Sequence, residues 1–139
     1  MVATHILDTI PKSIRIIRRI SASSISGELT LQQLRILMLV HEGMNTTQIA
    51  FNMHISTAAV SKTVEALVQK KFITREAGDD RRCLKLTLTE KGDRIRKLVR
   101  KDVEKELEKH LKKLTKQEQD DLKKGLSVLS KLMDFANEK

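Results

Sequence analysis

Isoleucine recurs at helical spacing close to the N-terminus. The spacings are four, three and three residues, for Ile10, Ile14, Ile17 and Ile20. This pattern places the four side chains on one face of an amphipathic helix. Pro11 is compatible with that helix if it lies in the first turn, where an N–H has no intrahelical partner. We therefore expect a helix that begins near Pro11 and is followed by a serine-rich loop over residues 21–27.

Three later helices are marked by capping residues. Two residue pairs have the spacing of a capping box: Thr30 with Gln33, and Asn45 with Gln48. Ser56 is a third N-cap candidate and stands directly before an apolar repeat. We expect the first of these helices to stop at Gly43.

The second and third of these helices are separated by only His54 and Ile55, which predicts a helix-turn-helix. In the third helix, Val60, Val64 and Leu67 recur at helical spacing and should face the core. The opposite face presents small, hydrogen-bonding or charged side chains: Thr57, Ala58, Ser61, Lys62 and Glu65. Such residues near a helix N-terminus suit close approach to base edges and phosphates in the major groove. An ordinary surface helix has a similar composition, so this pattern alone leaves both interpretations open.

A β-hairpin is expected directly after this helix. Residues 72–75 run from apolar to polar with β-branched residues between, and residues 83–88 alternate with three leucines on one face. Polar turn formers over residues 78–82 separate the two strands, so the unit becomes a winged helix. Arg81 and Arg82 at the tip could insert into the narrow, electronegative minor groove. The alternative for this arginine pair is a solvated turn.

Two long amphipathic helices are expected at the C-terminal end. Thr89 should cap the first helix, and Thr115 with Glu118 has the capping-box spacing for the second. The first helix carries an apolar residue at every fourth position: Ile95, Val99, Val103, Leu107 and Leu111. The second helix carries six apolar residues: Leu122, Leu126, Leu129, Leu132, Met133 and Phe135. One chain of this size cannot bury both stripes, so we expect them and the isoleucine helix to pack against a second subunit.

Together these elements predict a mainly α fold with a small β-hairpin wing, an α+β winged helix-turn-helix flanked by long dimerisation helices. We expect one structural domain in three parts. Residues 1–29 form an N-terminal dimerisation helix, residues 30–89 the DNA-binding lobe, and residues 90–139 the C-terminal dimerisation helices. The length of 139 residues agrees with one domain, because about 100–150 residues is the commonest domain size.

Composition favours duplex DNA as the partner. The chain has 27 Lys and Arg against 18 Asp and Glu, a formal net charge of +9. Twelve of these basic residues and six of the acidic ones lie within residues 56–100, the segment that holds the expected recognition helix and wing. Aromatic residues make up only 2% of the chain, without Trp or Tyr. The stacking platforms that RNA and single strands need are therefore largely missing.

Other classes of function find little support in the sequence. The single cysteine, Cys83, excludes an internal disulfide and a cysteine-rich zinc site. The sequence has no Gly-rich phosphate loop, nucleophile motif or metal signature, so we expect neither an enzyme nor a cofactor. The four histidines are scattered, and only a zinc site assembled across the fold stays open. No apolar run approaches the roughly 18 residues of a membrane span, and no signal sequence is evident, so we expect a cytoplasmic protein.

About half of the chain resembles the MarR family of bacterial and archaeal transcription regulators. The segments that carry this resemblance are Leu-Thr-Leu-Gln-Gln-Leu at 29–34, Asn-Thr-Thr-Gln-Ile-Ala at 45–50, Ile-Ser-Thr-Ala-Ala-Val-Ser-Lys at 55–62, Asp-Arg-Arg at 80–82 and Leu-Thr-Leu-Thr-Glu-Lys-Gly at 86–92. The most specific part is the Asp-x-Arg wing followed by Leu-Thr-x-x-Gly. A helix-turn-helix alone would be a weak signal, and the wing at this distance makes it strong.

The resemblance implies a homodimer, most often a repressor, in which two winged helices read a pseudo-palindromic operator in double-stranded DNA. By this analogy five recognition-helix residues touch DNA: Ser56, Thr57, Ala58, Ser61 and Lys62. Arg82 would be the minor-groove arginine, held in place by Asp80. The chain departs from the family at His54, where Gly is frequent, and at Lys62, where Arg is common. Lys is a point charge rather than a bidentate fork, so base preference is expected to differ.

Many members of the family respond to small anionic effectors bound between the DNA-binding lobe and the dimerisation helices. Arg15, Arg18 and Arg19 are candidate partners for such an anion, but the sequence favours a solvated or DNA-facing basic face as their explanation. Cys83 is expected to be a plain strand residue rather than an oxidant sensor. The rival to DNA binding is a winged helix that contacts other proteins, in which Lys62 and Arg82 would be merely exposed.

Overall fold

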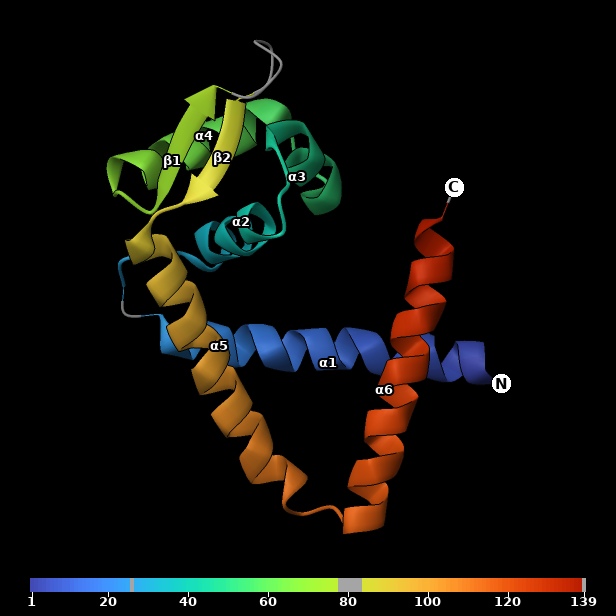
Figure 1. Ribbon diagram of the computed structural model, residues 1–139. Helices are drawn as coiled ribbons and strands as arrows, with labels where there is room; N and C mark the ends of the chain where they lie inside the picture. The colour runs from blue at the N-terminus through green and yellow to red at the C-terminus, as the bar shows by residue number, and fades with distance from the viewer. Residues whose placement is uncertain (26, 78–83, 139) are drawn as a thin grey trace. The chain divides into compact units, whose positions relative to one another are not determined.

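The computed structural model describes residues 1–25, 27–77 and 84–138. It is mainly helical, and its described part contains one two-stranded antiparallel sheet (Figure 1). The expected mainly α fold with a small hairpin is therefore confirmed. The chain divides into two compact units, Met1–Val103 and Glu104–Lys139.

Helix α1 spans Val2–Ser24 and is longer at both ends than the sequence predicted. The expectation that Pro11 lies in the first turn was wrong, because the helix runs through it. A proline inside a helix removes one hydrogen bond, here to the carbonyl of Leu7. Leu7 is 73% exposed, so water can satisfy that carbonyl in place of the missing N–H.

The serines at the end of α1 remain helical, which corrects the expected loop over residues 21–27. The hydroxyls of Ser21, Ser23 and Ser24 donate to carbonyls four residues earlier, at 2.8, 3.1 and 3.3 Å. Hydroxyls bonded back to the preceding turn are satisfied without leaving the helix. Serine richness therefore did not end the helix, and the connection to the next element begins only after Ser24.

Three helices follow at the positions that their capping residues predicted: α2 (Leu31–His41), α3 (Thr46–Met53) and α4 (Thr57–Gln69). Thr30 and Asn45 each complete a full capping box, accepting from the backbone N–H three residues later at 3.1 and 2.9 Å. The hydroxyl of Ser56 accepts from the N–H of Ala59 at 3.0 Å. Gly43 follows α2 with a φ of 88°, as expected for a helix that ends in a left-handed residue.

Two antiparallel strands form the hairpin that we call the wing: β1 (Ile73–Ala77) and β2 (Leu84–Leu88). Ile73 lies opposite Leu88, and Arg75 lies opposite Leu86. Because alternate residues share a face of a strand, these four residues lie on the same side of the hairpin. β1 starts one residue later than predicted, since Phe72 belongs to the preceding turn and is buried in the core.

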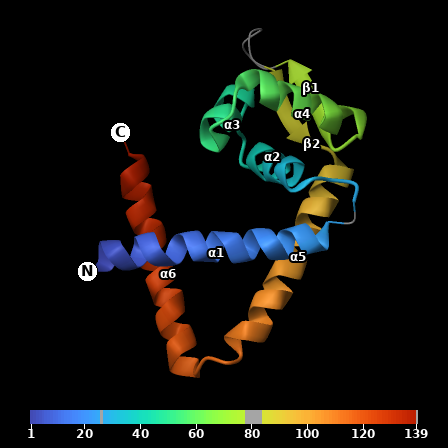
Figure 2. The same ribbon diagram turned by 180° about the vertical axis from the view of Figure 1, so that it is seen from behind.

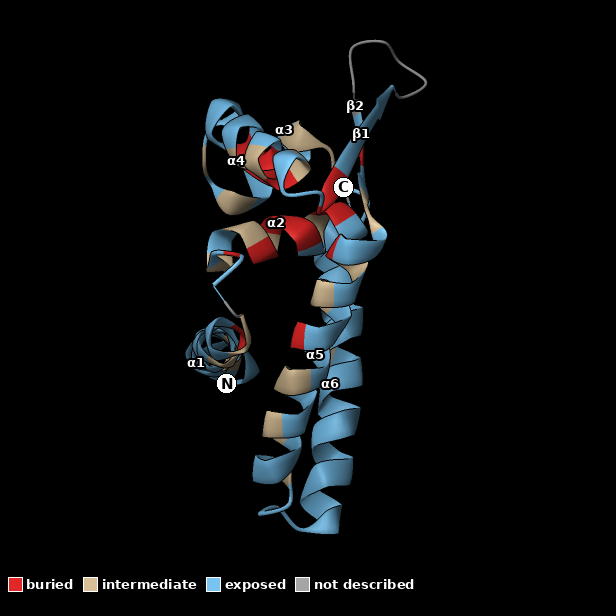
Figure 3. Cartoon of the chain, turned by 90° about the vertical axis from the view of Figure 1, so that its left-hand side faces the viewer, coloured by how far each residue is buried: buried red, intermediate tan, exposed pale blue. Residues whose placement is uncertain are grey.

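The core lies where α2, α3, α4 and the base of the wing meet, as Figures 1 and 2 show for the elements and Figure 3 for their burial. Its most deeply buried side chains come from all of these elements: Leu34, Ile36, Leu37, Ile49, Val60, Val64, Leu67, Phe72 and Ile73. The three apolar residues expected to turn α4 toward the core are among them. Helix α1 contacts this lobe through α2.

The start of helix α5 (Glu90–Leu111) is joined to the turn between α4 and β1 by several hydrogen bonds and one close backbone contact. Thr89 caps α5 as expected, accepting from the N–H of Gly92 at 3.1 Å. Its hydroxyl donates to the carbonyl of Lys71 at 2.6 Å, and its N–H donates to the carbonyl of Phe72 at 3.0 Å. A Cβ added to Gly92 would lie 2.2 Å from that Phe72 oxygen. Only glycine allows this approach.

The second unit holds the last residues of α5 and helix α6 (Lys116–Asn137). Thr115 and Glu118 form the expected capping box. The amide of Gln119 donates to the carbonyls of Leu111 and Leu114, which fixes the turn between the two helices. No described residue of α6 is buried, and its exposed large apolar residues are Leu122, Leu126, Val128, Leu132, Met133 and Phe135. In the described part of the chain, no helix combines the length and the apolar character that crossing a membrane requires.

Candidate nucleic-acid interface

The turn of the helix-turn-helix depends on an unusual backbone conformation at His54. This residue has φ 56° and ψ 41°, in the left-handed region that favours glycine. Its N–H bonds to the end of α3, and the N–H of Ile55 donates to the carbonyl of Ala50 at 3.1 Å. These bonds hold the sharp turn that directs α4 away from α3. The structure thus places a non-glycine residue in the strained position that the sequence pointed to.

The first two turns of α4 present an open polar surface. Thr57, Ala58, Ser61 and Lys62 are all exposed, in agreement with the face expected from periodicity. The short side chains of Thr57, Ala58 and Ser61 leave the N-terminal N–H groups of the helix accessible, and such groups attract phosphate. Lys62 adds a full positive charge and forms no ion pair with any described residue.

Glu65 on the same face has a charged partner, because Arg75 of β1 donates to its carboxylate in an ion pair. Gln69, one turn further along α4, donates to the other carboxylate oxygen at 3.5 Å. The sequence analysis missed this pair. The signal that could have found it is the two-residue step from buried Ile73 to Arg75, which turns both side chains to the same side of β1.

The wing follows α4 in the chain, and its first strand, β1, contacts that helix. Four of the residues discussed above lie outside the described residues: Asp80, Arg81, Arg82 and Cys83. The two strands pair along their full length, from Ile73 with Leu88 to Ala77 with Leu84. The described part of the wing therefore forms a regular stem next to the exposed face of α4.

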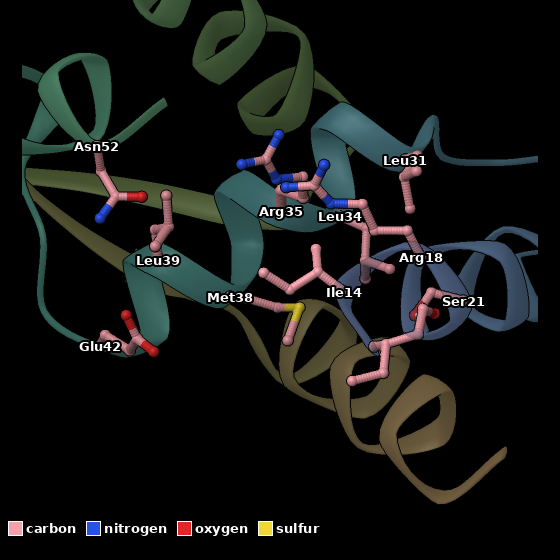
Figure 4. A pocket seen from close by; sticks show the side chains of 11 residues that line it. Ile14, Arg18, Ser21, Leu31, Leu34, Arg35, Met38, Leu39, Glu42 and Asn52 are labelled. Atoms are coloured by element: carbon pink, nitrogen blue, oxygen red, sulfur yellow. The ribbon is translucent and has the colours of Figure 1, made fainter. Parts of the chain in front are cut away.

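A second candidate site is a pocket of about 250 Å³ between α1 and α2 (Figure 4). Its walls are mostly apolar and include Ile14, Ile17, Leu34 and Met38. Two arginines, Arg18 of α1 and Arg35 of α2, place their guanidinium groups next to one another above these walls (Figure 4). The pocket therefore combines an apolar floor with two adjacent positive charges, and its one lining acid, Glu42, lies apart from them (Figure 4).

The two guanidinium groups are electrostatically frustrated. Burial lowers the pKa of Arg35 below its ordinary value, and the positive charge of Arg18 lowers that pKa further. Neither arginine forms an ion pair with an acidic side chain of the described residues. Two adjacent cations with no counter-ion favour the binding of an anion.

Of the three arginines that the sequence analysis named as effector candidates, the structure places only one at the pocket. Arg18 lines the pocket, whereas Arg15 and Arg19 are exposed residues of α1 outside it. Arg35 was missed, because nothing in its local sequence shows that α1 brings a second arginine beside it. Among the described residues, no three His, Cys, Asp or Glu side chains gather closely enough to hold a metal ion.

The residues expected at a dimer interface have different surroundings within the single chain. Half-buried positions are Ile10, Val103, Leu107, Leu111 and Leu129. Exposed positions are Ile14, Ile17, Leu122, Leu126 and Met133, with 41–54% of each residue accessible. Ile14 and Ile17 also line the pocket, so their stripe serves α2 as well as any second subunit.

Comparison with known structures places the fold among transcription regulators. The chain superposes on a transcriptional regulator of Thermotoga maritima with a TM-score of 0.77 and 18% identity, covering 97% of this chain and 99% of that one. For MarR of E. coli in its apo form, the TM-score is 0.70, the identity 20% and the coverage 86% and 93%. For MepR, a transcription regulator of a Staphylococcus aureus multidrug efflux pump, these values are 0.67, 19%, 88% and 95%.

The sequence itself matches the model of the MarR family over residues 29–84. A comparison with curated proteins found no match. The matched segment begins at the capped α2 and ends at the start of β2, so it contains the helix-turn-helix and the first strand of the wing. The family match and the shared fold agree with the geometry of α4 and the hairpin: the chain has a winged helix-turn-helix fold, and residues 29–84 resemble the MarR family of transcription regulators.

Proposed function

We propose that the chain acts as a homodimeric repressor in the cytoplasm that reads a pseudo-palindromic operator in double-stranded DNA. The observation that carries this proposal is the exposed, small-residue face at the start of α4 beside a regular hairpin stem. In this arrangement α4 enters the major groove, and Ser56, Thr57, Ala58, Ser61 and Lys62 contact bases and phosphates. The wing reaches the adjacent minor groove, with Arg81 and Arg82 at its tip and Asp80 supporting them.

The dimer is proposed from the apolar residues that the single chain leaves accessible. Helix α6 exposes six large apolar residues, and α1 exposes Ile14, Ile16 and Ile17. Several large apolar residues exposed along one helix mark an interaction site, and each of these two helices carries such a set. We assign residues 1–29 and 90–139 to dimerisation and residues 30–89 to DNA binding. Two lobes related by a two-fold axis then require half-sites about 10 base pairs apart, one helical turn.

Salt dependence of binding tests the DNA proposal against a protein-docking module. The wild-type chain is offered a random pool of duplexes, and affinity for a selected duplex is measured as salt rises. A DNA reader that neutralises several phosphates should lose affinity steeply, with log K falling linearly in log salt. A chain that selects no duplex, or whose binding is insensitive to salt, is not the proposed repressor.

We also propose that a small organic anion binding in the α1–α2 pocket releases the DNA. The pocket has apolar walls suited to a ring or short chain, and Arg18 with Arg35 can hold a carboxylate between them. The anion would relieve the repulsion between the two guanidinium groups and draw α1 and α2 together. Because α1 belongs to the proposed dimer interface and α2 supports α4, this shift would change the distance between the two recognition helices.

A further inference from the structure

The ion pair between Glu65 and Arg75 joins the two elements that the proposed function assigns to different grooves of DNA. Glu65 lies one turn after Ser61 and Lys62 on the exposed face of α4. Arg75 lies on β1, on the side of the wing that faces the helices. The contact therefore bridges the recognition helix and the stem of the wing.

The wing is already attached to α4 at its base. The N–H groups of Lys71 and Phe72 each bond back to the last turn of α4 at 2.9 Å, and Lys71 adopts a left-handed φ of 67°. Ile73 is buried in the core directly after this turn. From Thr74 onward β1 is exposed, and at the level of Arg75 core packing holds the hairpin through the other strand, where the opposite residue Leu86 is buried.

A ribbon held to the core through one strand can still turn about that contact, whereas a second attachment on the other strand fixes its direction. Arg75 supplies this second point two residues beyond Ile73, where Glu65 accepts from its guanidinium group. Gln69 donates to the other oxygen of Glu65 at 3.5 Å, which restrains the carboxylate on its own helix. We propose that Glu65 and Arg75 are positioning residues that set the direction of the wing relative to α4, and so let both grooves be read together. This proposal rests on the DNA-binding function proposed above.

The exposure of the ion pair indicates that it contributes little to the stability of the lobe. The side chains of Arg75 and Glu65 are 32% and 50% exposed. Ion pairs this open to water contribute little to the free energy of unfolding. The pair should therefore matter more for where the wing points than for whether the lobe folds.

The substitution Glu65→Gln gives opposite expectations for the two explanations. It removes a negative charge beside the duplex, so simple electrostatics predicts unchanged or tighter binding. A positioning role predicts weaker binding, by about tenfold, because the wing loses its second attachment. Glu76→Gln is the matched control, since Glu76 is an exposed acid on the same strand that forms no ion pair with a described residue.

The experiment measures the affinity of each variant for a duplex that the wild-type chain selects from a random pool. We expect Glu65→Gln to bind weakly and Glu76→Gln to bind at least as well as wild type. The double variant Glu65→Arg with Arg75→Glu should bind more tightly than either single variant. Dimethyl sulfate then reads both grooves: Glu65→Gln should lose protection of adenine N3 in the minor groove and keep that of guanine N7 in the major groove.

Three results would overturn the proposal. One is a Glu65→Gln affinity equal to that of Glu76→Gln, and another is a double variant no tighter than the singles. The third is a thermal midpoint for Glu65→Gln far below that of Glu76→Gln, which would make the pair a stability element. These results leave the proposed function intact, provided that the wild-type chain still selects a duplex. If it selects none, the proposed function fails, and the positioning role fails with it.

Discussion

Gly92 gives a prediction about how much a single Cβ matters at the joint between the lobe and α5. Gly92→Ala would place a methyl group 2.2 Å from the backbone oxygen of Phe72. Backbone cannot yield as a flexible side chain can, so we expect a loss of about 2 kcal/mol in the free energy of unfolding. Denaturant unfolding at fixed protein concentration measures this change.

The control for this prediction is Gly125→Ala in α6, where nothing lies within 4 Å of the added Cβ. Alanine has a higher helix propensity than glycine, so this variant should gain about 0.5–1 kcal/mol. Equal effects from the two substitutions would show that the close approach at Gly92 does not limit stability.

The pair of arginines in the α1–α2 pocket gives a prediction about ligand binding. Benzoate joins an apolar ring to a carboxylate, and we expect Arg35→Gln to weaken its binding by about tenfold or more, since a charged hydrogen bond is lost. Isothermal titration calorimetry measures the affinity. Arg15→Gln removes an equal charge from α1 outside the pocket and should bind benzoate as wild type does. Neutral benzamide should bind poorly to all three proteins, and equal binding of benzoate and benzamide would exclude an anion site.

At the scale of elements, the parts that could be predicted are those that depend on residues close in sequence. Capping boxes join residues three apart, so Thr30, Asn45 and Thr115 marked the starts of α2, α3 and α6 correctly. The extent of α1 was not predictable in the same way, because Pro11 and the terminal serines are ordinary loop signals. The helix continues through both signals. The carbonyl that Pro11 leaves without a partner belongs to the exposed residue Leu7, where water can reach it, and the serine hydroxyls bond to carbonyls within the helix.

In the candidate site too, the features set by residues close in sequence could be predicted, and those set by distant residues could not. The exposed face of α4 follows from periodicity, and its members were predicted from the sequence. Glu65 with Arg75, and Arg18 with Arg35, meet only because separate elements pack together. No local pattern records such a meeting, so both pairs had to come from the structure.

Capping also yields a prediction for α3, the first helix of the helix-turn-helix. Asn45→Ala removes the acceptor for the N–H of Gln48, a bond of 2.9 Å, and leaves the other half of the capping box alone. We expect a loss of about 1 kcal/mol in the free energy of unfolding. Thr47→Ala changes an exposed residue in the first turn of the same helix and should cost much less. Chemical denaturation followed by circular dichroism distinguishes the two variants, and similar losses would contradict the role of the cap.

For the whole molecule, the proposed dimer depends on the apolar stripe of α6. Leu126 is 54% exposed in the single chain, and Leu126→Asp would bury a charge if a second subunit covers it. We expect this variant to sediment as a monomer, or to unfold, at concentrations where wild type is a dimer. Ser127→Asp adds the same charge on a different face of α6 and should remain dimeric. Analytical ultracentrifugation gives the mass, and a dimer from Leu126→Asp would remove α6 from the interface.

The joint at Thr89 and Gly92 has a consequence for the DNA that a dimer could accept. α5 starts where the wing ends and is bonded to the turn after α4. The proposed DNA-binding lobe and the first turns of α5 must therefore rotate as one rigid unit. Each inserted base pair turns a half-site by roughly a tenth of a revolution around the duplex. A stiff joint cannot follow that rotation. If one base pair were inserted at the centre of the operator, only one lobe of the dimer could bind its half-site.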